Sequence, residues 1–304
     1  MQTKVEISTF FCYNVWRGGS MPKKIIIPNT KEMIYKLKNK VDGFILGLKG
    51  LSVNLPYYLE LDELLEVINN LTDKEIFVSL NKNMHNTDLE YLKEVLIRLG
   101  KTDIKGVIYY DVSIVNLKQE FNLALDLVWG QEHMTTNYLT MNYWYDFGAK
   151  YTLVSSDITF DEIKEISKLS KSKLMIQIFG YQPMFTSYRH LVNNYLKTFN
   201  IDDKSKEFKI EKEGNTYSIV DDKIGTTVYS NNILNGIEEY LELDVDYVVL
   251  NSYNINDFEN VIDLFNSVNK NNKTEYYKKI KDTYGNVDKG FLYKETVYRV
   301  KKND

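Results

Sequence analysis

The feature that most constrains this chain is a regular alternation of short apolar runs with longer amphipathic stretches. The stretches repeat apolar residues every three or four positions, which is the period of a helix with one buried face. Strands that alternate with helices are typical of α/β folds with a parallel sheet. The runs that predict strands are Lys24–Pro28, Gly43–Leu48, Ile76–Leu80, Val107–Tyr110, Ala124–Trp129, Tyr151–Val154, Leu174–Ile178 and Tyr247–Leu250.

Eight strand-then-helix units predict a (β/α)8 barrel of the TIM type, a fold that uses about 250 residues. Polar β segments around Gly214 and Gly225 interrupt the pattern, and we interpret them as a small β insertion between the seventh and eighth units. The rival architecture is an open doubly wound sheet. The chain has neither a GxGxxG turn nor a Walker loop, the phosphate-binding turns of such sheets, so the barrel is favoured.

The same pattern predicts the domain organisation. We expect residues 1–21 to form a flexible N-terminal arm, residues 22–205 and 231–270 the barrel domain, and residues 206–230 the β insertion. Residues 271–304 would form a C-terminal segment with a closing strand at Gly290–Tyr298.

Composition excludes several classes of function. Cys12 is the only cysteine, so neither a four-thiolate zinc site nor a four-cysteine iron–sulfur site can form within the chain. The net charge of −4 gives no overall basic footprint for nucleic acid. No apolar run approaches the roughly 20 residues of a membrane helix, and the N-terminus lacks the pattern of a signal peptide. We therefore expect a cytoplasmic protein that does not bind membranes.

Candidate functional residues follow from the barrel, because the loops after its strands converge on one face. For substrate binding these are Lys49, Asn81, Tyr110, Gln182, Arg189 and Asn251. The candidates for acid–base catalysis are Glu132, His133 and His85, since imidazole and carboxylate groups exchange protons near neutral pH. The alternative for both histidines is a hydrogen bond to loop backbone. Asp111 is predicted to cap the helix that starts at Ser113.

Metal and nucleophilic catalysis have little support in the sequence. The three histidines are scattered without His-x-x-x-His spacing, so no metal site is predicted. Ser187 has no base beside it except Arg189, which stays protonated.

Arg189 is one of four arginines among 38 basic residues. Its guanidinium offers two parallel donors that match a carboxylate or phosphate, which a lysine does not. Its position after the seventh strand therefore suggests an anion site. The alternative is a structural ion pair on the barrel rim.

The segment Phe179–Tyr195 resembles the signature of the collagenase-like peptidases, family thirty-two of the peptidases of unknown catalytic type. That signature runs His-Gly-x-x-Cys-x-x-x-Ser-x-Arg. Gly180, Ser187 and Arg189 match it, whereas Phe179 replaces the histidine and Pro183 the cysteine.

Two further segments are similar to one branch of this family, the shorter subunit of the bacterial tRNA uridine 5-hydroxylation proteins. They are Trp129–Trp144 and the Asn81–Asn86 loop. The resemblance implies a role in tRNA modification, a prephenate-like carboxylate co-substrate, a longer family paralogue as partner, and contact with tRNA through that partner. Arg189 and Lys49 would hold the carboxylate.

Family members of this kind typically hold a [4Fe–4S] cluster through four cysteines. This chain has Pro183, His190, Asn232 and Met141 at those positions, so we expect the cluster to be absent. Three functions stay open: a diverged tRNA-hydroxylation subunit, a peptidase or other hydrolase, and a non-catalytic scaffold. Whether the chain is itself an enzyme is left undecided by the sequence.

Overall fold

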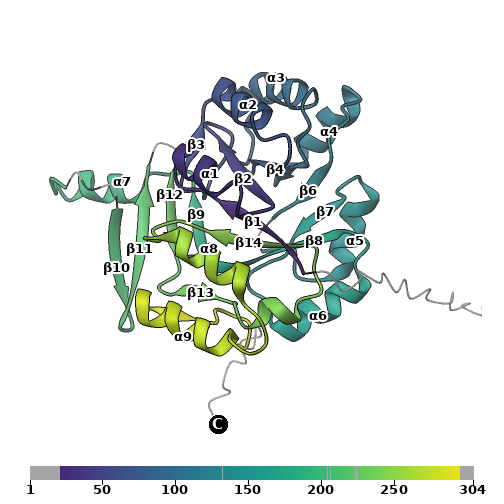
Figure 1. Ribbon diagram of the computed structural model, residues 1–304. Helices are drawn as coiled ribbons and strands as arrows, with labels where there is room; N and C mark the ends of the chain where they lie inside the picture. The colour runs from purple at the N-terminus through teal and green to yellow at the C-terminus, as the bar shows by residue number, and fades with distance from the viewer. Residues whose placement is uncertain (1–20, 132, 204, 206, 223–224, 295–304) are drawn as a thin grey trace, which may run out of the picture.

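The computed structural model describes residues 21–131, 133–203, 205, 207–222 and 225–294. Within these ranges eight parallel strands close into a ring, which confirms the predicted barrel (Figure 1). Strand β14 closes the ring because it pairs in parallel with β1 on one side and with β8 on the other. In ring order the strands are β1 (Lys23–Ile27), β2 (Gly43–Leu48), β4 (Glu75–Leu80), β5 (Gly106–Tyr109), β6 (Leu127–Trp129), β7 (Tyr151–Leu153), β8 (Lys173–Gly180) and β14 (Tyr247–Asn251).

Alternation along each strand divides the core into two parts. Ile25 and Ile27 of β1 point into the barrel, while Ile26 between them packs against the surrounding helices. Inside the barrel, the ring of Phe77 meets those of Tyr151 and Tyr247 edge to face, with centroids 5.6 and 5.5 Å apart, and the two tyrosine rings are tilted against each other at 5.9 Å. Large side chains therefore fill the interior, and the barrel is a packed core rather than a channel.

Helices surround the ring on its outer side (Figure 1). Their bounds are α1 (Lys31–Leu37), α2 (Leu61–Asn69), α3 (Leu89–Leu99), α4 (Ser113–Glu120), α5 (Tyr138–Asp146), α6 (Phe160–Leu169), α8 (Phe258–Ser267) and α9 (Lys273–Tyr284), with short 3-10 turns η1 (Asn86–Asp88) and η2 (Glu239–Glu242). The hydroxyls of Thr30 and Thr159 cap α1 and α6, accepting from the backbone N–H of Met33 and Glu162.

The insertion forms a separate antiparallel sheet beside the barrel. It contains β9 (Pro183–Ser187), β10 (Glu207–Lys212), β11 (Asn215–Asp221) and β12 (Thr226–Tyr229), in the order β10-β11-β12-β9. The insertion was predicted to start at residue 206, but β9 of this sheet lies before that residue. The sheet therefore includes part of the segment that directly follows β8, the seventh barrel strand. Helix α7 (Leu191–Thr198) projects from this sheet and contributes no buried residue to the barrel wall (Figure 1).

Three short strands complete the described chain. β3 (Tyr58–Leu59) pairs in parallel with the end of β2, and β13 (Ile233–Asn235) pairs antiparallel with the end of β8 and parallel with β15 (Val287–Asp288). The expected closing strand at Gly290–Tyr298 is wrong for residues 290–294, which form turns because the chain bends back to α6. There the carbonyl of Leu292 accepts a hydrogen bond from Phe160 N at 2.9 Å. Residues 295–298, and the predicted arm except Met21, lie outside the described ranges.

Candidate functional site

The mouth of the barrel is nearly filled. The cavity at the carboxyl ends of the strands has a volume of about 70 Å³ and is lined by Gln177, Gln182, Pro183 and residues of the neighbouring strands. It is small because β9 starts three residues after β8 ends and places Pro183 over the opening. Gln182, predicted to bind substrate, does line this cavity and is buried.

Two of the predicted substrate-binding amides are engaged in holding backbone. Asn81 forms a pair of hydrogen bonds with Val53, accepting from its N–H at 2.9 Å and donating to its carbonyl at 3.0 Å. Asn251 accepts from Tyr253 N at 3.0 Å and donates to the Tyr181 carbonyl at 3.3 Å. Both side chains are buried, so in this structure their hydrogen-bonding groups shape the loops at the rim.

The signature glycine has a steric role at the same rim. Gly180 has φ +104°, and a Cβ at this position would lie 2.3 Å from the carbonyl oxygen of Asn251. The ends of β8 and β14 come this close because β8 bulges where it pairs with Leu250. A glycine is therefore needed here for both backbone conformation and space.

Other predicted residues lie on the outer rim. Lys49 is exposed and pairs with Glu60, and this hydrogen bond raises the pKa of Lys49. His85 is exposed at the start of η1, where its backbone N–H donates to Asp88. Tyr110 is half-buried after β5. The predicted helix cap is confirmed, because the carboxylate of Asp111 accepts from Ser113 N at 2.9 Å.

The predicted acid–base pair after β6 is only partly described. Glu132 lies outside the described residues. His133 is exposed, and its Nδ1 lies 3.3 Å from a carboxylate oxygen of Asp157. The candidate catalytic residues His85 and His133 are thus surface side chains on separate loops.

Arg189 lies between β9 and α7, on the insertion and not in the barrel mouth. Its side chain is exposed, and among the described residues no carboxylate forms an ion pair with it. The structure therefore shows no rim ion pair for Arg189 within those ranges. Its backbone carbonyl accepts a hydrogen bond from Thr226 Oγ1 at 2.9 Å, which fixes the start of α7 to β12.

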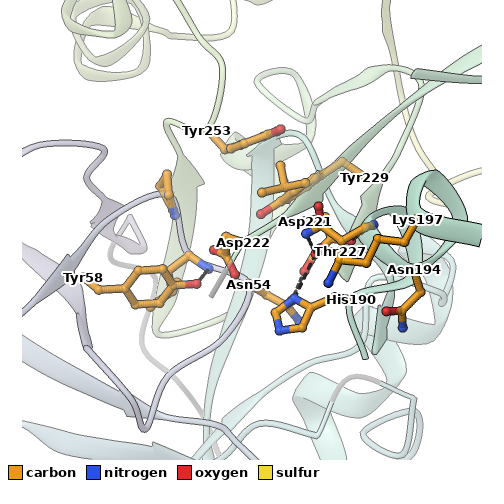
Figure 2. Close-up of a pocket in the computed structure, with 14 residues that line it drawn as sticks. Asn54, Tyr58, His190, Asn194, Lys197, Asp221, Asp222, Thr227, Tyr229 and Tyr253 are labelled. Carbon is orange, nitrogen blue, oxygen red and sulfur yellow. Dashed lines mark hydrogen bonds and ion pairs between the residues drawn. The ribbon is translucent and has the colours of Figure 1, made fainter. Parts of the chain in front are cut away.

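A much larger cavity lies between the insertion and the loop after β2. This insertion cleft has a volume of about 870 Å³ and lies between residues 54–58 on one wall and α7, β11 and β12 on the other (Figure 2). The cleft is of the size that small-molecule and cofactor sites occupy. Neither its position nor its size follows from the rule that places active sites at the barrel mouth.

The cleft contains a buried carboxylate with a full set of donors. Asp221, whose side chain is 0% exposed, accepts from Val192 N at 2.8 Å, from Asn193 N at 3.0 Å and from Asn193 Nδ2 at 3.2 Å. Its other contact is His190 Nδ1 at 3.0 Å (Figure 2). A carboxylate at this distance accepts the Nδ1 proton, which leaves Nε2 as the nitrogen that is available to a ligand.

The two walls of the cleft are tied together by one amide. Asn54 Oδ1 accepts hydrogen bonds from Thr186 Oγ1 at 2.8 Å and from Thr227 Oγ1 at 2.9 Å. Asn54 has φ +61°, a left-handed conformation that asparagine tolerates better than most residues. Tyr229 and Tyr253 stack at 3.9 Å between ring centroids and form the floor.

Tyr58 lines the same cleft on the barrel side. Burial raises the pKa of its phenol well above the usual value. The phenol therefore stays neutral, and its oxygen accepts a hydrogen bond from Leu55 N at 3.2 Å.

The sequence reasoning missed this arrangement, although part of a signal was present. His190 directly follows Arg189 in the signature segment, where it was noted only as the replacement of a cysteine. Asp221 carries no local signal, because it meets His190 across 31 residues and only after the insertion has formed its sheet.

Two general properties of the structure bear on function. In the described ranges, no three His, Cys, Asp or Glu side chains gather as they would around a metal ion. None of the helices in those ranges combines the length and hydropathy needed to cross a lipid bilayer.

Comparisons with known proteins agree with this fold and signature. A curated relative, the tRNA hydroxylation protein P2 of Bacillus subtilis strain 168, is 26% identical over 312 residues, which span 91% of this chain and 99% of that protein. The solved structure of the U32 peptidase Mk0906 aligns over 77% of this chain and 93% of its own, with a TM-score of 0.50 and 14% identity, so it supports the fold alone. The family model for peptidase family U32 matches residues 28–299. The chain therefore belongs to peptidase family U32.

Proposed function

We propose that this protein acts in tRNA modification, as a subunit for the 5-hydroxylation of wobble uridine. The observation that carries the proposal is the match to the tRNA hydroxylation protein P2, which extends over nearly the whole of both chains. Because the match spans 91% of this chain, we assign the proposed role to the barrel and the insertion together.

The proposal includes a division of labour with a second protein. One cysteine cannot supply the thiolates of a [4Fe–4S] cluster, so the redox chemistry falls to a longer, cysteine-rich family paralogue. This chain contributes a binding surface, and tRNA is contacted by the pair. Arg189 is the better candidate for holding a prephenate-like carboxylate co-substrate, because Lys49 is already paired with Glu60.

A peptidase activity has less support from the geometry. Hydrolysis of a peptide requires an activated nucleophile or a metal-bound water. Within the described ranges, the imidazoles of His133 and His190 contact Asp157 and Asp221, and no imidazole contacts a serine hydroxyl. No specific observation therefore favours this second function.

The proposal is tested by deleting the gene and measuring modified nucleosides. Total tRNA is digested and the 5-hydroxyuridine derivatives are quantified by liquid chromatography and mass spectrometry. We expect these derivatives to be lost and to return when the wild-type gene is restored. Unchanged levels in the deletion strain would refute the proposed function.

Two controls separate the parts of the proposal. A tagged copy expressed from the native locus should co-purify with a longer family member, and its absence would remove the subunit assignment. Purified protein should not cleave gelatin. Cleavage that a single substitution abolishes would instead establish the hydrolase.

A further inference from the structure

We propose that the insertion cleft binds a nucleotide, with the phosphate beside Lys197 and the base between His190 and the wall formed by residues 54–58. The choice of ligand rests on the proposed function, since a tRNA-modification subunit has to hold a nucleotide of its substrate. The site itself rests on the geometry of the cleft, which is independent of that function.

The cationic side of the cleft is one face of α7. His190 and Lys197 are seven residues apart, which is about two helical turns, so both lie on the face that lines the cleft. Lys197 is exposed and forms no ion pair with a carboxylate in the described ranges. A lysine ammonium is a point charge well suited to a phosphate.

The start of α7 does not serve as the anion site. The N–H groups of its first turn are already engaged, because that of Leu191 donates to Thr226 and those of Val192 and Asn193 donate to Asp221. Recognition of a phosphate therefore falls to the side chains further along the helix. The same carboxylate holds His190 in place, with Nε2 on the side of the ring away from Asp221 (Figure 2).

Asn194 and the wall opposite it fit a base. The exposed amide of Asn194 offers a donor and an acceptor, the pairing that reads the edge of a base. Pro56 and Tyr58 provide apolar surface on the opposite wall. The cleft volume of about 870 Å³ exceeds one nucleotide, so a nucleotide that is still attached to an RNA loop also fits.

The test uses the imidazole resonances of the full-length protein. The chain has three histidines, and His85 and His133 are exposed and do not line the cleft, so they act as internal controls. Two probes are titrated: uridine 5′-monophosphate, and an anticodon stem-loop RNA with an unmodified wobble uridine. We expect saturable shifts of the His190 signals alone. No shift with either probe, or equal shifts of all three histidines, would overturn the proposal.

The two probes identify the source of the ligand. Shifts with both indicate a nucleotide presented by RNA. Saturable shifts with the mononucleotide alone support the site and assign it to a free nucleotide. A stem-loop whose wobble position is abasic should bind about tenfold more weakly than the uridine form, because stacking and edge contacts of one base are lost.

Variants of α7 test the assigned contacts. Lys197→Ala should weaken binding of the mononucleotide about fivefold, through loss of one charge at the phosphate. Lys209→Ala, on the exposed strand β10 and outside the cleft, is the matched control and should stay within about twofold. Asn194→Trp should abolish binding by filling the cleft, with circular dichroism to verify the fold. Equal effects of the two lysine variants would contradict the proposal.

The outcomes distinguish this inference from the proposed function. If the deletion strain loses 5-hydroxyuridine derivatives but Asn194→Trp restores them and binds both probes normally, the cleft proposal fails and the function stands. If the deletion leaves tRNA unchanged while His190 still reports saturable binding, the function fails and the nucleotide site stands.

Discussion

At the scale of single residues, the family signature in this chain is explained by packing as much as by chemistry. Gly180 lies against the carbonyl of Asn251 where β8 meets β14, and its φ of +104° is unfavourable for any side chain. The sequence identified Gly180 as a match to the signature. It could not show the reason, because the partner is 71 residues away, from 180 to 251, and becomes adjacent only when the barrel closes.

Replacing Gly180 should destabilise the protein through both crowding and backbone strain. A second glycine, Gly50, separates these two causes. Gly180→Ala is expected to lower the free energy of unfolding by about 3 kcal/mol or more, from overpacking together with backbone strain. Gly50→Ala has a similar φ of +86° with no atom within 4 Å of the added Cβ, so about 1 kcal/mol is expected. Urea denaturation measures both, and equal losses would show that crowding is unimportant.

The candidate site illustrates the limit of prediction at this scale. Asn81 and Asn251 were predicted from their positions after strands; Asn81 does follow β4, whereas Asn251 is the last residue of β14. What position alone could not reveal is that their amides bond to neighbouring backbone. His190 and Asp221 come together through the pairing of β11, β12 and β9, which no local pattern in the sequence specifies.

At the scale of elements, the barrel strands could be predicted closely and the insertion could not. Gly43–Leu48 was predicted with the bounds that β2 has, because an unbroken apolar run is typical of a strand buried on both faces. Tyr151–Val154 differs from β7 by one residue. In contrast, α7 has the amphipathic pattern of a helix that packs against a barrel, yet none of its residues is buried. The pattern therefore gave no indication that α7 lies away from the barrel wall.

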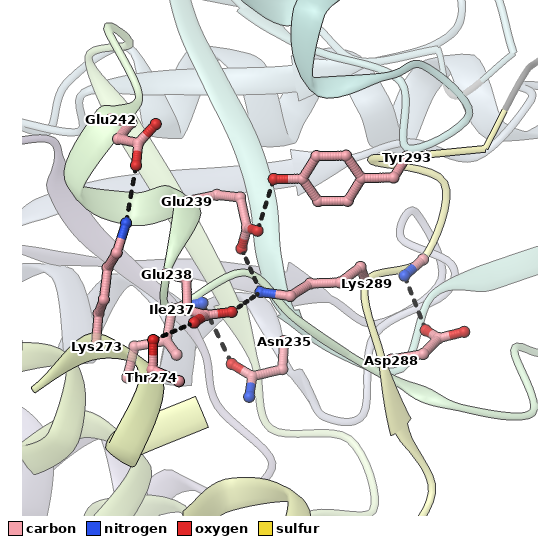
Figure 3. Close-up of polar contacts among 11 residues, drawn as sticks. Asn235, Ile237, Glu238, Glu239, Glu242, Lys273, Thr274, Asp288, Lys289 and Tyr293 are labelled. Atoms are coloured by element: carbon pink, nitrogen blue, oxygen red, sulfur yellow. Dashed lines mark hydrogen bonds and ion pairs between the residues drawn. The ribbon is translucent and has the colours of Figure 1, made fainter. Parts of the chain in front are cut away.

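The C-terminal segment is held to the barrel by a compact ionic contact (Figure 3). Lys289 Nζ donates to Glu238 and to Glu239, each at 2.8 Å, and Glu239 also accepts from the Tyr293 hydroxyl at 2.9 Å. Glu239 is only 5% exposed, so its charge depends on these donors. This contact joins η2 to β15 and the turn that follows it.

Removing the lysine should destabilise the protein strongly. Lys289→Met leaves the buried carboxylate of Glu239 without its cation, and a loss of about 3 kcal/mol is expected. Lys294→Met is the control, because Lys294 is exposed and its pair with Asp288 is 3.4 Å long, so less than about 1 kcal/mol should be lost. Thermal unfolding compares them, and similar losses would contradict the assigned role.

The same contact predicts a dependence on pH. Burial raises the pKa of Glu238, but hydrogen bonds from Lys289 and Thr274 outweigh it, so the pKa lies below its usual 4.5. A lowered pKa in the folded state stabilises the protein above pH 4.5, and this contribution is lost as the pH falls through the folded value. Lys289→Met should therefore lose less stability than the wild type between pH 6 and pH 3. If the free energy of unfolding falls equally with pH in the variant and the wild type, this prediction is refuted.

At the scale of the whole molecule, a packed barrel carries an insertion whose outer elements, α7 and β10, are mainly exposed. The core lies in and around the ring, whereas α7 contributes no buried residue and β10 is an edge strand with exposed side chains. The cleft lies where these two parts meet. A fold prediction based on the barrel could place the ring, but the site depends on a sheet that ordinary barrels lack.

Hydrogen exchange should reveal this difference in the isolated protein. Amides of α7 and β10 are expected to exchange about 100-fold faster than those of β4 and β14, because few buried contacts oppose their local opening. Mass spectrometry of peptides after pulse labelling measures the rates. Protection of α7 equal to that of β14 would contradict a weakly packed helix.

The pairing of β14 with both β1 and β8 also has a consequence for synthesis on the ribosome. Until β14 emerges, the nascent chain has seven barrel strands whose first and last edges remain open to other chains. The hairpin of β10 and β11 is synthesised earlier and its contacts are local, so it can fold before the barrel is complete. Translation arrest just before residue 247 would therefore leave a chain that depends on chaperones, whereas arrest beyond β14 would release a closed ring.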